Sequence, residues 1–222
     1  QHWRSPQGRR RFIDACSKQM TILLIRHGET DGNASRIIQH PETPLNARGR
    51  AQATKVALKI SEERNVEAVL SSDYKRAQET ALEISEKMKI PPTFSDSLRE
   101  RNFGDLRGKS YDEIGGIDLF AEDFVPPGGE SWAKFRQRVE LAWHNITERK
   151  KDLRGTLVIV THGLFIRSLI ERTLHIGKGL TYDELIVENT SITCVTGTPP
   201  WEVTVLANTD HLDQKTGEGG IV

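Results

Sequence analysis

Two apolar stretches of the chain, TILLIRHG and TLVIVTHG, each end in a histidine followed by a glycine, at His27 and His162. Arg26 directly precedes the first histidine, and Arg76 lies early in a helix-length stretch after a third apolar run. The planar guanidinium of arginine binds phosphate through two parallel hydrogen bonds, and a neutral imidazole can attack phosphorus and carry the phosphoryl group. These residue types indicate phosphoryl transfer, provided that the fold brings them together.

The predicted elements around these residues place them at one edge of a sheet. Strands are predicted over 21–26, 66–71, 93–97, 156–161, 191–196 and 203–207, and helices over 47–64, 73–88, 131–151 and 164–174. Strands that alternate with helices predict an α/β fold, a three-layer sandwich with a mainly parallel sheet and helices on both faces. Such sheets bind ligands at the carboxyl ends of their strands, so we expect both histidines and both arginines to line one crevice there.

Backbone and loop groups next to the two histidines are further candidates for substrate binding. The glycine after each histidine allows a close backbone approach, and the helix that begins near Leu164 turns its positive end toward the same place, so Gly163 and Leu164 are expected to contact the substrate. Gln39 and His40, in the loop after the first histidine, are candidates to line the pocket, although His40 fits a solvated loop equally well. With this much positive charge in the site, we expect neither a metal nor another cofactor.

A leaving alcohol needs a proton, so the site also requires a general acid. Four glutamates are candidates, and residue periodicity does not choose among them: Glu29, Glu42, Glu100 and Glu130. Residues 98–130 are rich in glycine and the least regular part of the chain, which predicts a lid or an insertion.

Eight short blocks, in this order, resemble the histidine phosphatase superfamily, the phosphoglycerate mutase-like proteins, over residues 21 to about 212. They are Arg26-His27-Gly28-Glu29-Thr30 with Asn33, Pro44-Leu45-Asn46 with Gly49, Ser71-Ser72-Asp73 with Arg76, Leu98-Arg99-Glu100-Arg101 with Gly104 and Gly108, Pro127-Gly128-Gly129-Glu130-Ser131, Thr161-His162-Gly163 with Arg167, Asn189-Thr190-Ser191-Ile192, and His211-Leu212. The roles that the resemblance implies are His27 as the phosphorylated nucleophile, Glu100 as proton donor and then base for water, and Arg26, Arg76, His162 and Asn33 as phosphate ligands.

The resemblance favours a phosphatase over a mutase. Only 25 residues, 101–125, lie between Glu100 and Pro126, whereas the cofactor-dependent mutases of the family carry a longer insertion there. Three segments are most similar to the TIGAR-type fructose-2,6-bisphosphatases and also resemble broad-specificity phosphatases: 98–109, 124–130 and 161–169. The resemblance therefore implies a metal-independent phosphomonoesterase with a small phosphorylated substrate, for example a sugar bisphosphate such as fructose 2,6-bisphosphate. The alternatives are a cofactor-dependent phosphoglycerate mutase and a catalytically idle phospholigand-binding module.

Composition limits the partners and the compartment. Thirty-one basic and thirty-one acidic residues among 222 give a formal charge of zero, so a general attraction to nucleic acid or to a membrane surface is not expected. No apolar run approaches the roughly 20 residues that span a membrane. Two cysteines are too few for a disulfide framework, which favours a cytoplasmic protein. We expect a monomer or a homodimer.

The first 20 residues differ in charge from the rest of the chain. Five basic residues against one acidic residue give them a charge of plus four (5 − 1), through Arg4, Arg9, Arg10, Arg11 and Lys18 against Asp14. We predict a basic leader over 1–20, disordered or processed, a phosphatase domain over 21–212 and a flexible tail over 213–222. If the leader is the remnant of a transit peptide, the compartment would be the mitochondrion instead.

Overall fold

The computed structural model of the chain describes residues 21–63, 65–181 and 185–212. The predicted leader, 1–20, and the predicted tail, 213–222, lie outside the described residues, so these boundaries stay predictions. Within the described ranges no helix is long and apolar enough to cross a membrane.

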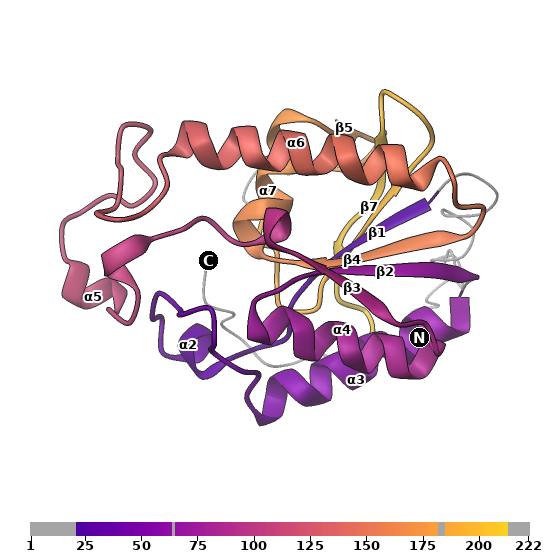
Figure 1. The fold of residues 1–222 in the computed structure, drawn as a ribbon, viewed down its shortest axis with the longest axis horizontal. Coiled ribbons are helices and arrows are strands. Elements are labelled where there is room, and N and C mark those ends of the chain that lie inside the picture. Colours follow the sequence, from indigo (N-terminus) through magenta and orange to yellow (C-terminus); the bar gives the residue numbers. More distant parts are fainter. Residues whose placement is uncertain (1–20, 64, 182–184, 213–222) are drawn as a thin grey trace, which may run out of the picture.

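A seven-stranded sheet with the order β3-β2-β4-β1-β6-β7-β5 forms the middle of the molecule (Figure 1). Strand β1 pairs parallel with β4 and antiparallel with β6, so the predicted parallel arrangement holds for β3, β2, β4 and β1, while β6 and β7 form an antiparallel pair beside them. The strands are β1 Thr21–Arg26, β2 Val66–Ser72, β3 Pro92–Ser95, β4 Thr156–Thr161, β5 His175–Ile176, β6 Ile192–Thr196 and β7 Glu202–Asn208.

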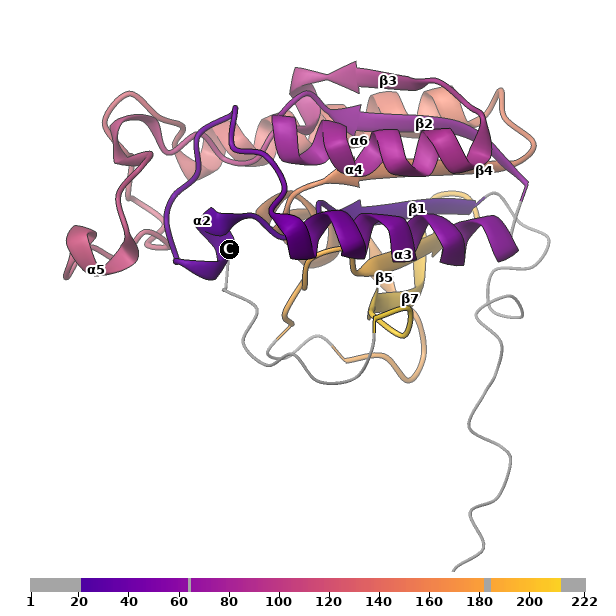
Figure 2. The same cartoon turned by 90° about the horizontal axis from the view of Figure 1, so that it is seen from below.

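Helices cover both faces of the sheet, which confirms the predicted three layers: α3 and α4 lie on one face and α6 and α7 on the other (Figures 1 and 2). The helices are α2 Asp31–Ala34, α3 Ala47–Glu63, α4 Lys75–Met88, α5 Tyr111–Ile114, α6 Trp132–Lys150 and α7 Gly163–Arg172, with short 3-10 helices η1 Asp96–Leu98 and η2 Gly104–Leu106. Sequence patterns predicted the four long helices and missed α2, α5, the two 3-10 helices and β5.

Side-chain alternation along the central strands gives the sheet two separate cores. In β1, Ile22 and Leu24 pack in the larger core with α6 and α7, while Leu23 and Ile25 pack in the other core with α3 and α4. Neighbouring β4 alternates in the same way. Because full burial of such a side chain stabilises a fold by roughly 1.5–3 kcal/mol, both strands are held firmly in register on two sides. The strand ends, where the histidines lie, are therefore fixed.

The arrowheads of β1, β2 and β3 point toward the end of the molecule at which α2 and α5 lie (Figure 2). The irregular segment 98–130 is fastened here by one buried arginine, Arg101. Its three guanidinium nitrogens donate to the carbonyl oxygens of Leu119 (2.9 Å), Phe124 (2.7 Å) and Glu130 (3.1 Å). These hydrogen bonds fix the segment beside the carboxyl ends of the strands.

Candidate active site

His27 is the residue after β1, and its surroundings fix which ring nitrogen is free to react. Nδ1 lies 2.7 Å from the carbonyl oxygen of Gly28, which can only accept, so Nδ1 carries the hydrogen. Nε2 then keeps its lone pair and accepts a hydrogen bond of 3.2 Å from Nε of Arg76. The backbone of His27 is tied to neighbouring segments, because its N–H donates to Thr161 and its carbonyl accepts from the Asn189 side chain, both at 2.9 Å. The imidazole therefore presents an oriented nucleophilic nitrogen.

Buried nitrogen atoms without a protein partner lie in residues near His27, namely Arg26 and His162. Nε and Nη2 of Arg26 are buried and unpartnered, while Nη1 donates to the carbonyl of Val187 at 2.7 Å. His162 lies with its ring centroid 5.1 Å from that of His27, and its buried Nδ1 is also unpartnered. Its Nε2 lies 2.8 Å from the hydroxyl of Ser72, which already accepts from the backbone N–H of Tyr74. If that hydroxyl donates to Nε2, Nδ1 of His162 becomes a donor.

Burial and the arginine charges keep both histidines neutral. Burial, then the charges of Arg76 and Arg26, lowers the pKa of His27 well below its ordinary value of 6.5. The same three causes, together with His27, lower the pKa of His162 well below that value. Burial also lowers the pKa of Arg76 to about 10, so this guanidinium stays charged at neutral pH. The site combines neutral imidazoles with two buried cations, which is the charge pattern of an anion-binding nucleophilic centre.

Glu100 is the carboxyl group that faces this centre. It follows η1 and lines the same cavity as His27 and Arg76. Its two oxygens accept hydrogen bonds of 3.0 Å from the backbone N–H groups of Arg101 and Leu164. Burial raises the pKa of Glu100, and the two amides and the charges of Arg76 and Arg26 offset this increase only in part. A carboxyl group that is oriented and has a raised pKa is suited to donate a proton and later to accept one.

The other three candidate glutamates are held elsewhere. Glu29 accepts from Asn46 (3.0 Å) and Arg48 (2.7 Å), so its carboxylate anchors the start of α3. Glu130 pairs with Arg138, and Glu42 lines an outer cavity rather than the cavity of His27. Of the four candidate glutamates, Glu100 is the one that lines the cavity of His27.

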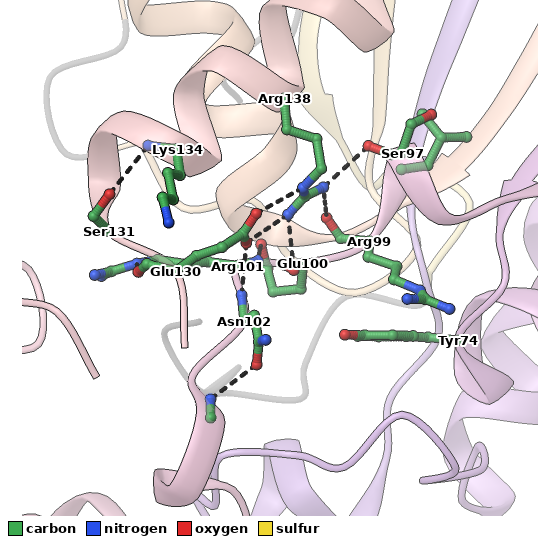
Figure 3. A network of polar contacts seen from close by, with 12 residues as sticks. Tyr74, Ser97, Arg99, Glu100, Arg101, Asn102, Glu130, Ser131, Lys134 and Arg138 are labelled. Atoms are coloured by element: carbon green, nitrogen blue, oxygen red, sulfur yellow. Dashed lines mark hydrogen bonds and ion pairs between the residues drawn. The ribbon is translucent and has the colours of Figure 1, made fainter. Parts of the chain in front are cut away.

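Arg138 of α6 and its partner Glu130 hold the backbone on both sides of Glu100 (Figure 3). Its guanidinium donates to the carbonyl oxygens of Ser97 (3.0 Å), Arg99 (2.8 Å) and Glu100 (3.2 Å). It also binds the Glu130 carboxylate through two hydrogen bonds of 2.9 and 2.8 Å, and Glu130 in turn accepts from the backbone N–H of Asn102 at 2.9 Å. We call this Arg138–Glu130 pair the backbone clamp. Sequence reasoning missed it, because its partners are mostly main-chain atoms.

Three of the predicted substrate-binding residues lie in or near the loop after β1. Asn33 is buried, and its Oδ1 accepts from the backbone N–H of Thr30 (3.2 Å) and from Asn189 (3.3 Å). Gln39 lines the cavity of His27. The side chain of His40 is exposed and lines neither cavity described here, but its carbonyl accepts from Nη1 of Arg76 at 3.1 Å. His40 thus positions a phosphate-binding candidate through its backbone.

Backbone groups after the two histidines differ from expectation at two points. The N–H of Gly28 donates to the Thr80 hydroxyl (3.0 Å), so it is not free for phosphate, and a side chain at Gly28 would lie 2.6 Å from the carbonyl oxygen of Gly49. Close helix packing explains this glycine. The N–H of Leu164 binds Glu100 instead of pointing at an open site. Gly163 begins α7 directly beside the guanidinium of Arg26, which agrees with its predicted place.

Two adjacent cavities open at the site. The inner cavity is open to solvent; besides His27, Arg76, Glu100 and Gln39, its lining is Ile37, Ile38, Tyr74, Arg101, Phe103, Arg107 and Tyr111. The outer cavity shares Tyr74, Glu100 and Arg107 with it. Among the residues that the structure describes, no group of three or more His, Cys, Asp or Glu side chains is placed to hold a metal ion. The inner cavity meets the outer cavity beside Glu100.

Comparison with known proteins gives the same picture as this geometry. The sequence profile of the histidine phosphatase superfamily (branch 1) matches residues 22–209. Phosphoglycerate mutase-like protein 4 of Arabidopsis thaliana is 35% identical over 214 residues, which cover 90% of this chain and 91% of the relative. A metal-independent phosphoserine phosphatase of the same plant is 34% identical over 169 residues, 70% of this chain and 69% of the relative.

A solved structure has the same fold. A phosphoserine phosphatase variant from Entamoeba histolytica, in complex with phosphoserine, superimposes with a TM-score of 0.70 at 26% identity. The superposition covers 86% of this chain and 98% of that one.

Proposed function

Because the chain belongs to the histidine phosphatase superfamily and is a phosphatase, we propose that it hydrolyses phosphate monoesters through a phosphohistidine at His27, without a metal ion. One observation carries the proposal: the buried donors Nε and Nη2 of Arg26 and the buried Nδ1 of His162 lack a partner beside the oriented Nε2 of His27. Buried polar groups are normally paired, so this set is expected to bind an anion. A phosphoryl group would satisfy it.

In the first step, Nε2 of His27 attacks phosphorus while the bond to the leaving oxygen breaks. Arg26, Arg76 and His162 stabilise the charge on the three equatorial oxygens, which is the main catalytic contribution in phosphoryl transfer. Glu100 enters this step protonated, as burial favours, and gives its proton to the leaving oxygen. The products are a free alcohol and a phosphohistidine beside an ionised Glu100.

In the second step, water replaces the alcohol. The Glu100 carboxylate removes a proton from the water as its oxygen attacks phosphorus, and the P–N bond breaks. Inorganic phosphate leaves, His27 is neutral again, and Glu100 is protonated for the next turnover. The hydrogen bond from Nδ1 to the Gly28 carbonyl supports the positive charge of the phosphorylated ring, since only Nδ1 still carries a hydrogen.

The proposed metal-free chemistry rests on the positive groups already present. Arg26 and Arg76 are both at most 3% exposed, so their charges act in a medium that screens them weakly. Two guanidinium groups and an imidazole N–H can supply the charge stabilisation that Mg²⁺ gives in other phosphoryl transferases.

We propose a small phosphorylated metabolite as the substrate. Relatives are named for phosphoserine and for phosphoglycerate, which makes these esters the first to test. A sugar bisphosphate such as fructose 2,6-bisphosphate remains a further candidate from the sequence. The open inner cavity favours hydrolysis over mutase activity, because a mutase must keep water away from its phosphohistidine while the bound product reorients.

The experiment is direct detection of the phosphohistidine. Protein mixed briefly with a ³²P-labelled ester and quenched in alkali should carry an acid-labile label on His27, found by peptide mapping. His27→Ala should abolish both label and turnover while leaving the thermal unfolding transition in place. A label on His162, or turnover that survives in His27→Ala, would refute the proposed mechanism.

A further inference from the structure

Arg107 lies at the mouth of the active site, and its guanidinium group takes part in neither of the two proposed catalytic steps. It lies just after η2, it is half-buried, and it lines the inner cavity beside His27 and the outer cavity as well. Its Nη2 donates to the phenolic oxygen of Tyr74 at 2.9 Å. No carboxylate among the described residues forms an ion pair with it, so its charge is not neutralised by the protein there.

The neighbouring arginines, by contrast, are neutralised or fully engaged. Arg99 forms a bidentate pair with Asp73, and Arg138 is paired with Glu130. All three guanidinium nitrogens of Arg101 are bonded to carbonyl oxygens. Arg107 is therefore the charged group of the inner cavity that remains open to a ligand beyond the phosphate cradle.

Arg107 and Arg76 both line the inner cavity. Arg107 lies close enough to Arg76 to act against that group's charge, alongside the larger effect of burial. Two like charges at one cavity repel each other, and the proposed phosphoryl group would be bound by Arg26, Arg76 and His162, which leaves Arg107 without an anion. A second anion beside Arg107 would relieve the repulsion.

We propose, building on the proposed function, that Arg107 binds a second anionic group, a carboxylate or a phosphate, on the leaving-group side of the substrate. Tyr74, Glu100 and Arg107 are the three residues shared by both cavities, so a leaving group that starts at Glu100 passes Arg107 on its way out. Ile37 and Phe103 offer an anion no partner, and Gln39 and Tyr111, which also line the inner cavity, offer only neutral donors. The planar fork of arginine suits both anions.

The test compares substrates that differ in this second anion alone. For the carboxylate we use 3-phosphoglycerate against glycerol 3-phosphate, and for the phosphate we use fructose 1,6-bisphosphate against fructose 6-phosphate. A charged hydrogen-bonding pair predicts that the native enzyme prefers the doubly anionic member of at least one pair by about tenfold or more in kcat/KM. The preferred pair identifies the anion.

Arg107→Gln should remove this preference. We expect kcat/KM to fall about ten- to a hundredfold for the doubly anionic substrate, mainly through KM, and to stay within about threefold for its partner. Arg107→Lys should keep part of the preference, and Tyr74→Phe, which removes the hydrogen-bond partner but no charge, should retain it. The matched control is Arg36→Gln, an exposed arginine that stacks on Tyr111 but lines neither cavity.

Three results would overturn the inference. The first is an equal loss of kcat/KM for both members of a pair in Arg107→Gln. The second is that the native enzyme hydrolyses both members without any preference. The third is an equal effect of Arg36→Gln, which would indicate a general electrostatic field of the protein instead of a binding site. In each of these cases the native protein is still phosphorylated on His27, so the proposed function stands. No label on His27 with any of the four esters would refute the proposed function itself, and this inference with it.

Discussion

Loss of the backbone clamp is expected to impair proton donation more than phosphoryl transfer. Arg138 makes five hydrogen bonds, three of them to the carbonyls of Ser97, Arg99 and Glu100. Arg138→Lys keeps the charge but cannot bridge these groups with a planar fork, and Glu130→Gln weakens the pair from the other side. We therefore expect the Glu100 carboxyl to shift from its place without loss of the phosphate cradle.

The magnitude follows from burial and from the number of bonds. The side chains of Arg138 and Glu130 are about one-fifth exposed, at 23% and 20%, so water can replace some of the hydrogen bonds that a variant loses. Hydrogen bonds to charged groups contribute about 1.5–3 kcal/mol each, and with this replacement we expect the free energy of unfolding to fall by about 2–4 kcal/mol. A general acid displaced by a fraction of an ångström should cost about ten- to a hundredfold in kcat.

The assay measures kcat for an alkyl phosphate and for an activated aryl phosphate on each variant. The alkyl ester needs the proton of Glu100, whereas the aryl leaving group is stable as an anion, so its rate should change by less than about threefold. Arg136→Gln is the matched control, because Arg136 lies on the same helix and also forms a bidentate pair, with Glu122, but far less of that pair is buried. Equal losses with both esters, in variants that still unfold cooperatively, would refute the positioning role.

Three further predictions test the site. Glu100→Gln should lower turnover of an alkyl phosphate about a hundredfold or more and that of an activated aryl phosphate much less; equal losses would remove Glu100 as the acid. The free energy of unfolding, measured in denaturant, should fall as the pH drops below about 6.5. The reason is that His27 and His162 take up protons in the unfolded state, whereas their lowered pKa values keep them neutral in the folded state. His162→Asn should make this pH dependence less steep, while the control variant at the exposed His144, His144→Asn, should keep it. Purified protein should release inorganic phosphate from phosphoglycerates, unaffected by a chelator, and should not interconvert 2- and 3-phosphoglycerate after priming with 2,3-bisphosphoglycerate; interconversion faster than release would favour a mutase.

The sequence alone determined the elements that position the nucleophile. The apolar, β-branched runs over 21–26 and 156–161 have the composition and length of buried strands, and both are strands in the structure. Because a parallel sheet aligns its strand ends, His27 and His162 had to lie near each other once these strands were neighbours. The long helices also follow from local patterns. The four-residue helices α2 and α5 are too short to show a period.

Tertiary structure decided which candidate groups lie together and what surrounds each of them. The resemblance to known proteins suggested Glu100, but local sequence treats it like Glu29, Glu42 and Glu130, and only folding places it opposite His27 with its oxygens bound to Arg101 and Leu164. The tautomer of His27, the unpartnered donors of Arg26 and the backbone clamp depend on contacts between residues far apart in the chain. Periodicity reports which face of an element is buried, whereas hydrogen-bond partners and desolvation depend on the neighbours that the complete fold provides.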